Sequence, residues 1–393
     1  MIKLIVLITS ELLTFLVLWQ HYKNLSKVKL YLSIIINSIL SIYMWILFIV
    51  VSSYKGNADN PAHIWLMMNL NCTFCAVLAP RVILDILHFT GKLIRIRKGG
   101  HIRSLTNTGL IIWLVIFIII VSGNKIGRFN FKTEEISLKI PGLKKDLEGL
   151  TIVQISDIHI PGFYHNKKEL IKAMHIVNMM KPDILINSGD FVDDGWREFE
   201  RSDTILSLAS GRFGSFAIIG NHDIGTYDRD FDEAGRDTNV VRMNELIKDS
   251  GYRVLNDENT YIKIGNARVA IIGVITKGRH GHMIHGDLSK AMTGTDSADF
   301  RILITHDPNH WEEAVKGKTN IELTLAGHTH GMQMGILTKR FRWSPAQYFY
   351  PRWNGLYSSG NQFLYVNRGL GVLGVPFRIW MPPEITVIRL TSN

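Results

Sequence analysis

Four long apolar runs in the first 123 residues limit what this chain can fold into. They cover about residues 2–19, 30–51, 64–87 and 107–122. A helix that crosses a bilayer needs roughly 17–25 predominantly apolar residues, so each run is long enough or nearly so. We therefore expect residues 1–123 to form an α-helical bundle of four transmembrane spans, and the protein to be membrane-integral.

The distribution of charge predicts which side of the membrane each part occupies. The net charge is +10, and residues 1–123 hold 11 Lys and Arg against 3 Asp and Glu. Basic residues gather in loops 21–29 and 88–106, whereas loop 52–63 is nearly neutral. Because Lys and Arg accumulate on the cytoplasmic side, the N-terminus, loop 52–63 and the chain after residue 122 are predicted to lie outside.

Two basic residues, Lys125 and Arg128, flank the fourth run on that outer side and count against this topology. The basic excess suits membrane-flanking loops better than a nucleic-acid surface, so no nucleic-acid partner is expected. No obligate protein partner is evident either.

Ionisable residues inside the apolar runs have two interpretations. Glu11 lies near the middle of the first run, and Arg81 and Asp85 lie four residues apart in the third. Such groups are often functional because intramembrane charge is unfavourable. The second interpretation is a neutral Glu11 bonded to another helix and an Arg81 that reaches the interface and pairs locally.

The hydrophobic pattern of the sequence changes from residue 150. After a linker and entry strand over residues 124–149, short apolar runs alternate with helical patterns, which is typical of an α/β domain over residues 150–393. A later hairpin-like part indicates a second, mixed sheet. The expected buried strands are LTIVQISD (150–157), DILINSGD (183–190), GSFAIIGNHD (214–223), FRILITHD (300–307) and IELTLAGH (321–328).

Each of these five strands ends in a polar cluster. Because the carboxyl ends of strands are where sites form in α/β sheets, the five clusters are expected to meet at one edge. They combine carboxylates, one amide and imidazoles without any cysteine, a set that suits manganese, iron or zinc. The clusters are Asp157-Ile-His159, Gly189-Asp190-Phe-Val-Asp193, Gly220-Asn221-His222-Asp223, His306 and Gly327-His328-Thr-His330.

The number of candidate ligands exceeds what one metal needs, and two metals form a known device for displacement at phosphorus. Residues i and i+2 of an extended or tightly turned segment point to the same side, so His328 and His330 are expected to reach one site, where they could serve the same metal or different metals.

In their order along the chain, the motifs DIH, GDFVD, GNHD, the single His306 and GHTHG resemble the calcineurin-like metallophosphoesterase superfamily. The resemblance covers roughly residues 145–393 and implies a four-layer α/β/β/α sandwich. The stretches LKKDLEGLTIVQISDIH and YVNRGLGVLGVPFRIWMPPEITVIRL are similar to the membrane-anchored bacterial phosphodiesterase-like branch of the YkuE/YaeI type. That branch implies a multi-pass protein of the bacterial cytoplasmic membrane.

The resemblance also implies roles for individual residues. It implies two divalent ions, with manganese favoured over iron or zinc, and a bridge between them at Asp190. His222 would contact the scissile phosphate and protonate the leaving group, Asp223 would orient His222, and Asp193 would support the ligands. The first ion would be bound by Asp157, His159 and His330, and the second by Asn221, His306 and His328.

The function implied is a membrane-anchored phosphoesterase that cleaves a phosphodiester or pyrophosphate bond by in-line attack of a metal-bridging hydroxide. Four spans favour a lipid or envelope-linked substrate. A second candidate is UDP-2,3-diacylglucosamine pyrophosphatase of lipid A synthesis, which the predicted topology disfavours because that substrate is cytoplasmic. Two rival hypotheses are a non-catalytic metal-binding sensor or scaffold, and a transporter with an accessory domain.

Several features have more than one interpretation. Met332 stands where relatives usually have glycine, and could alter substrate fit; Arg368 could meet a phosphate or be a buried structural residue. The aromatic and basic segment 341–357 suits a membrane interface or ordinary packing equally. Two further clusters are interpreted as surface loops rather than metal sites: His280, His282 and His285, and Asp228, Asp230 and Asp232.

Overall fold

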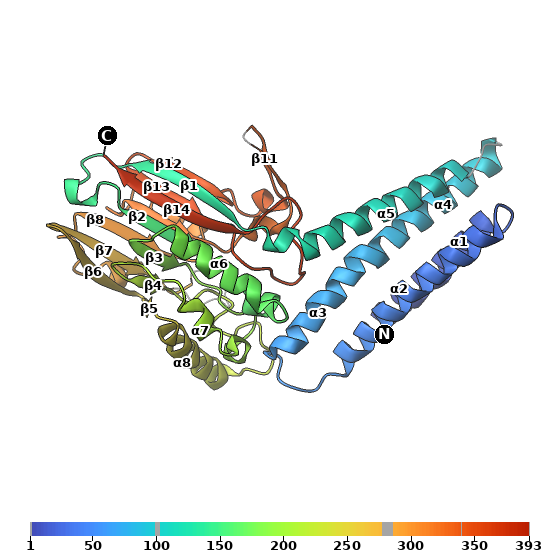
Figure 1. Ribbon diagram of the computed structural model, residues 1–393, viewed down its shortest axis with the longest axis horizontal. Helices are drawn as coiled ribbons and strands as arrows, with labels where there is room; N and C mark the ends of the chain where they lie inside the picture. Colours follow the sequence, from blue (N-terminus) through green and yellow to red (C-terminus); the bar gives the residue numbers. More distant parts are fainter. Residues whose placement is uncertain (1, 99–102, 277–285, 339, 393) are drawn as a thin grey trace. The chain divides into compact units, whose positions relative to one another are not determined.

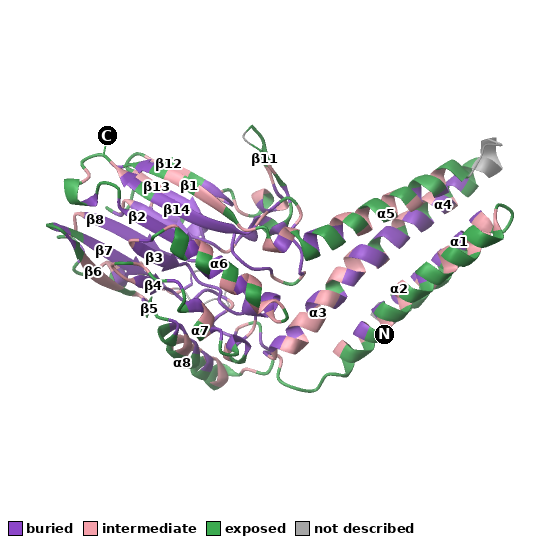
Figure 2. Cartoon of the chain, viewed as in Figure 1, coloured by how far each residue is buried: buried purple, intermediate pink, exposed green. Residues whose placement is uncertain are grey.

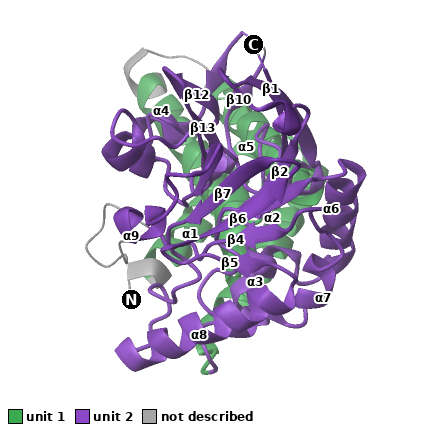
Figure 3. Cartoon of the chain, turned by 90° about the vertical axis from the view of Figure 1, so that its left-hand side faces the viewer, with its two compact units in different colours: residues 1–55, 66–126, 374–377 green, residues 56–65, 127–373, 378–393 purple. Residues whose placement is uncertain are grey.

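A computed structural model describes residues 2–98, 103–276, 286–338 and 340–392. The chain divides into two compact units, coloured separately in Figure 3. Unit 1 comprises Met1–Lys55, Leu66–Ile126 and Gly374–Phe377, and unit 2 comprises Gly56–Trp65, Gly127–Leu373 and Arg378–Asn393. The histidines of the segment 280–285 lie outside the described residues.

Unit 1 is built from long helices, as expected. Four candidate spans are long and apolar enough to cross a membrane, and many of their apolar side chains are exposed. A five-residue π-helix, η1, interrupts the third span, where one extra residue per turn widens the helix. The helices are α1 (Ile2–Tyr22), α2 (Lys27–Ser53), α3 (Pro61–Thr73), η1 (Phe74–Leu78), α4 (Ala79–Lys98) and α5 (Arg103–Lys125).

Polar contacts inside unit 1 join helices to one another. The side chain of Arg81 is fully buried, lies 3.8 Å from Glu11 and donates to the carbonyl oxygen of Asn37 on α2. Trp45 Nε1 donates to Glu11 at 2.9 Å. Arg81 therefore does not reach an interface, as one interpretation of the sequence required, but pairs across helices, which satisfies charge in an apolar bundle.

Unit 2 contains two six-stranded sheets (Figure 1). The first has the order β1-β14-β2-β3-β4-β5 and the second β12-β13-β9-β8-β7-β6. The strands of the first sheet are β1 (Lys132–Lys139), β2 (Thr151–Ile155), β3 (Ile184–Asn187), β4 (Ser215–Ala217), β5 (Arg253–Val254) and β14 (Glu384–Thr391). Those of the second are β6 (Glu258–Ile264), β7 (Ala267–Gly273), β8 (Phe300–Ile304), β9 (Leu323–Ala326), β12 (Gly355–Ser359) and β13 (Gln362–Val366).

The two sheets and the helices on their outer faces form four layers, which confirms the predicted α/β/β/α sandwich. One apolar cluster lies between the sheets, a second packs α6 (Lys167–Met179), α7 (Asp203–Leu206) and α8 (Glu233–Asp249) on the first sheet, and a third packs α9 (Leu288–Met292) and η6 (Trp311–Val315) on the second. Strands covered on both faces are buried along their whole length and mostly apolar, as β2 and β8 are (Figure 2).

The remaining elements are short. The 3₁₀ segments η2 (Gly127–Phe129), η3 (Lys145–Leu147), η4 (Ile160–Phe163) and η5 (Trp196–Phe199) lie in the first half of unit 2. The second half adds η7 (His330–Gln333), η8 (Pro345–Tyr348) and a small hairpin of β10 (Ile336–Leu337) and β11 (Arg342–Trp343).

Strand register places the site. β2, β3 and β4 are parallel neighbours, as are β8 and β9. Ile155 pairs with Asn187, so β2 and β3 end level, and Ile304 pairs with Leu325 in the second sheet. The loops after these strands therefore leave their sheets at the same edge, which is where the five polar clusters of the sequence begin.

Candidate metal centre

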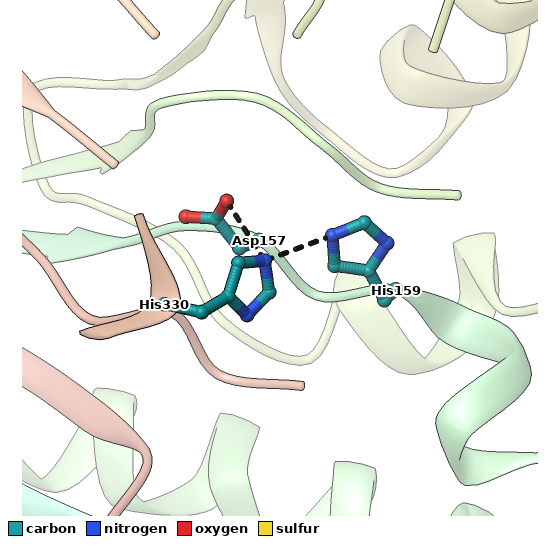
Figure 4. Close-up of side chains that lie close together, drawn as sticks. All are labelled: Asp157, His159 and His330. Atoms are coloured by element: carbon teal, nitrogen blue, oxygen red, sulfur yellow. Dashed lines mark hydrogen bonds and ion pairs between the residues drawn. The ribbon is translucent and has the colours of Figure 1, made fainter. Parts of the chain in front are cut away.

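Two groups of side chains converge where the five strands end. The first contains Asp157, His159 and His330, and within it the candidate ligand atoms lie within 4.8 Å of one another (Figure 4). The second group contains Asp190, His306 and His328. His328 and His330 thus belong to different groups, although one residue separates them in the chain.

Asp190 lies beside both groups. Its Oδ2 atom is 2.9 Å from Nε2 of His306 in its own group and 3.8 Å from Nε2 of His159 in the other. Its Oδ1 atom accepts a hydrogen bond from the backbone N–H of His222. The Oδ2 atom of Asp190 therefore lies beside a histidine of each group, whereas Oδ1 accepts a backbone N–H.

The hydrogen bonds of His306 test whether the second group suits a cation. Its Nδ1 atom lies 2.8 Å from the carbonyl oxygen of Ser188, which can only accept, so Nδ1 carries the proton. In a neutral ring, Nε2 then presents a lone pair to the Asp190 carboxylate at 2.9 Å. Two acceptors this close require a shared cation, either a proton or a metal ion.

The first group shows the same arrangement at His159. Nδ1 of His159 lies 2.9 Å from Oδ1 of Asp193, which fixes the ring and directs Nε2 towards Nε2 of His330 at 3.1 Å. A carboxylate on the far nitrogen is the usual partner of a metal-bound histidine, because it sets the tautomer and strengthens the donor.

Asn221 carries the amide that the family resemblance assigns to the second ion. Its Nδ2 donates to the hydroxyl of Tyr227 at 3.0 Å, whereas its buried Oδ1 has no hydrogen-bond partner within the described part of the chain. An orphaned buried oxygen is unfavourable unless a ligand satisfies it. The amide oxygen therefore fits a metal ligand that completes the set of carboxylates and imidazoles.

Burial and charge decide the protonation of the histidines. Burial lowers the pKa of His328 to about 3 and that of His330 to about 4. Both rings are therefore uncharged at neutral pH, and each has a nitrogen lone pair that can bind a metal. Burial also opposes charge on His159, but the Asp193 carboxylate raises its pKa to about 9. Burial likewise opposes charge on His306, whereas Asp190 raises its pKa to about 10.

Backbone strain gathers at the same residues. Asp157, His159, Asp190, His328 and His330 all have φ between +45° and +72°, a region that costs side-chain-bearing residues about 1–3 kcal/mol each. Such strain persists where surrounding contacts impose it and is concentrated at functional sites. No sequence pattern predicted this strain, since none of these residues is a glycine.

Glycines allow the loops to approach closely. A side chain at Gly220 would collide with the Asp190 carboxylate, and one at Gly327 would collide with Ser156 and Asp157. Gly189 has φ of +98°, and an added Cβ would lie 2.7 Å from the backbone nitrogen of Gly220. Of these three, Gly189 therefore uses the conformational freedom of glycine, and the other two are required by space.

His222 and Asp223 occupy different environments. His222 stacks on Tyr227, and its Nδ1 must donate to the carbonyl oxygen of Asp193, which leaves Nε2 as the nitrogen able to exchange a proton with a ligand. Asp223 was predicted to orient this ring. Its buried carboxylate instead accepts four backbone N–H groups, those of Asp190, Phe191, Val192 and Gly220, and so holds the ligand-bearing loop.

The two predicted substrate contacts also differ from each other. Arg368 is buried and lies 2.9 Å from Glu134 and 3.1 Å from Glu384, which favours the structural role over phosphate binding. Met332 has φ of +45° and is 46% exposed next to the His330 loop, so its side chain remains available to a ligand.

Residues that the sequence did not single out complete the site. The hydroxyl of Tyr350, from the aromatic segment 341–357, lies 2.8 Å from Nε2 of His328. Arg378 lies 3.4 Å from Nδ1 of His330, and Glu198 accepts the N–H groups that follow the Asp190 loop. Among these three, only Glu198 had a local signal, because a glutamate at the third position of a helical turn can accept the N–H of the residue before the turn, here Gly195.

Comparison with known proteins agrees with this geometry. The family described as Calcineurin-like phosphoesterase matches residues 150–332. The Bacillus subtilis protein named Uncharacterized metallophosphoesterase YkuE is 27% identical over 265 residues, covering 67% of this chain and 86% of that protein. The Campylobacter jejuni protein named Uncharacterized metallophosphoesterase Cj0846 is 28% identical over 326 residues, covering 82% of this chain and 79% of its own length.

A vertebrate relative combines the same features. The Danio rerio protein named Transmembrane protein with metallophosphoesterase domain is 29% identical over 270 residues, which are 66% of this chain and 57% of that protein. The sandwich, the strand-end clusters and these relatives agree, and residues 150–332 are therefore identified as a calcineurin-like phosphoesterase domain, which supports a hydrolase of phosphoric esters.

Proposed function

We propose that the protein is a membrane-anchored phosphodiesterase with a two-metal centre. The observation that carries this proposal is the pair of ligand groups that share Asp190. In this proposal Asp157, His159 and His330 hold one divalent ion, and Asn221, His306 and His328 hold the other. Manganese is favoured, because the donors are carboxylate, amide and imidazole without thiolate.

When bound, two such ions would supply positive charge to the phosphate and acidify a water for in-line attack. The chain's own residues would position the ligands and supply the proton. Asp193 holds the His159 ring, Asp223 holds the Asp190 loop, and His222 offers Nε2 for a proton that the leaving oxygen needs.

The proposed substrate class is supported by the four candidate spans. Four apolar helices in the same chain as the site support a substrate that resides in the membrane, such as a phospholipid or glycolipid headgroup. The low basic content of loop 52–63 supports a phosphoesterase domain outside the cytoplasm, in the bacterial cytoplasmic membrane. A nucleotide-linked lipid precursor is the second candidate if the domain is cytoplasmic.

The reaction class is tested with the full-length protein in detergent, bis(p-nitrophenyl) phosphate as substrate, and Mn²⁺. Asp190→Asn should abolish hydrolysis and reduce bound metal while leaving membrane insertion intact. Near-normal activity in Asp190→Asn would overturn the two-metal proposal, and full metal content without turnover in the wild type would favour a sensor or scaffold.

The substrate class is tested by topology. Reporter fusions after residues 25, 105 and 393 should place the first two inside and the last outside. A cytoplasmic C-terminus would contradict the proposed side and make UDP-2,3-diacylglucosamine hydrolysis the first assay.

A further inference from the structure

The segment between the second and third apolar helices belongs to unit 2 rather than to the helices that it connects. Residues Gly56–Trp65, which include the first residues of α3, group with unit 2, and within them Asp59 is completely buried. A loop that only joins two helices would place a carboxylate in water, because burying an ionised group without partners is strongly unfavourable. The burial of Asp59 therefore requires an explanation in unit 2.

The partners of Asp59 lie in the turn that follows the Asp190 loop. Both carboxylate oxygens lie 3.0 Å from Nη1 of Arg197, and Oδ2 also accepts the backbone N–H of Arg197 at 3.3 Å. A Cβ added to Gly195 would lie 2.8 Å from Asp59 Oδ2, so the turn rests directly on this carboxylate. Next to it, the N–H of Ala58 donates to Asp230.

The same turn fixes the backbone of Asp193. It carries Glu198, whose fully buried carboxylate accepts the N–H groups of Asp193, Asp194 and Gly195. Three bonds to one carboxylate hold these residues in a single conformation. The backbone of Asp193 is therefore positioned by Glu198, and the turn that carries Glu198 is held by the contacts of Arg197 with Asp59.

Asp193 in turn orients two histidines of the site. Its side chain lies 2.9 Å from Nδ1 of His159, and its carbonyl oxygen accepts from Nδ1 of His222. Direct contacts thus connect Asp59 to His159. They run through the Arg197 turn, which is the 3₁₀ segment η5 that also carries Glu198, and then through Asp193. Each residue on this path before His159 can be changed without removing a candidate ligand.

We propose that Asp59, from the loop between α2 and α3, is a positioning residue for the metal centre, acting through the Arg197 turn and Asp193 on His159 and His222. The proposal rests on the proposed two-metal function. It makes the loop between two membrane helices part of the catalytic unit, so a change in that loop alters metal binding and turnover rather than anchoring alone.

The test uses Asp59→Asn in the full-length protein, because the amide keeps the size of the side chain and removes the charge. Mn²⁺ affinity should fall about tenfold, the lower end of the range for residues that support metal ligands. The kcat for bis(p-nitrophenyl) phosphate should fall at saturating Mn²⁺, with little change in KM. Arg212→Ala is the matched control, since Arg212 forms an exposed 3.9 Å pair with Asp183 in the same unit.

A double-mutant cycle separates positioning from general damage. If Asp59 acts through Arg197, the double variant Asp59→Asn/Arg197→Gln should lose no more Mn²⁺ affinity than the more damaging single variant. Additive losses, or an unchanged affinity and kcat in Asp59→Asn, would overturn the proposal. Should Asp59→Asn not fold, Arg197→Gln carries the test alone, because that side chain is 39% exposed.

Hydrogen–deuterium exchange distinguishes this proposal from the proposed function. If the wild type binds no Mn²⁺ and hydrolyses nothing, the two-metal proposal fails, but the exchange of amides 189–198 still reports on Asp59. Faster exchange of these amides in Asp59→Asn, and not in Arg212→Ala, would support the positioning role. Equal exchange in all three proteins would contradict it.

Discussion

The Oδ1 atom of Asp193 lies 2.9 Å from Nδ1 of His159. This ring nitrogen is not the one that faces the other candidate ligands. The sequence predicted that Asp193 supports the ligands rather than binding a metal. Its carboxylate fixes the far nitrogen of His159, so that Nε2 faces His330. A substitution of Asp193 therefore tests how much metal binding depends on the orientation of the ligand rings rather than on the number of ligand atoms.

We predict that Asp193→Asn weakens metal binding about 10–100-fold without removing a donor atom. The amide can still accept a hydrogen bond but no longer offers a charge that strengthens the imidazole. Mn²⁺ titration of the purified full-length protein measures the change, and Asp237→Asn, at an exposed position of α8, is the control. An affinity equal to that of the wild type would show that the pair does not tune the site.

We predict that His222→Gln lowers kcat about 10²–10⁴-fold and leaves metal affinity nearly unchanged. Glutamine cannot release a proton from the position of Nε2, whereas the candidate ligand groups do not include His222. The deficit should shrink for esters with acidic leaving groups, which depart without a proton. A uniform loss across leaving groups would contradict the role in proton transfer.

Much of this site was predictable because its parts follow strands. Buried strands such as TIVQI and FRILI have a clear apolar pattern, and the polar residues after them stand out against it. The carboxyl ends of parallel strands are adjacent in space, so the approach of Asp157 and Asp190 follows from the pairing of β2 with β3. The approach of His306 to both carboxylates depends in addition on how the second sheet packs on the first.

The remainder depends on contacts between distant segments that no local pattern records. Tyr350 reaches His328 from a loop rich in aromatic residues, for which packing and a membrane interface were equally favoured interpretations. Asp59 lies in a loop that was predicted only as a membrane connection, yet it is completely buried. The family resemblance implied that Asp223 orients His222, whereas its carboxylate accepts hydrogen bonds from the backbone of a preceding loop.

We predict that bound metal stabilises unit 2. Ligands that bind only the folded state add about 2.7 kcal/mol at a concentration 100 times Kd, so Mn²⁺ should raise the unfolding temperature and a chelator should lower it. The change should vanish in Asp190→Asn, because both groups lose their shared carboxylate. An unfolding temperature independent of Mn²⁺ in the wild type would argue against a metal-binding site.

We predict that Tyr350→Phe impairs the second ligand group and not the first. The substitution removes only the hydroxyl that lies 2.8 Å from Nε2 of His328, so any effect reports on the orientation of that ring. In titrations that resolve two binding steps, one should weaken by several-fold while the other is unchanged, since a hydrogen bond of this kind contributes about 0.5–1.5 kcal/mol. Tyr348→Phe is the control, because Tyr348 is 72% exposed in the same segment. Equal effects of the two substitutions would assign the change to the aromatic segment as a whole. No effect of either would mean that the hydrogen bonds from the His328 backbone N–H to Asp157 are enough to hold His328.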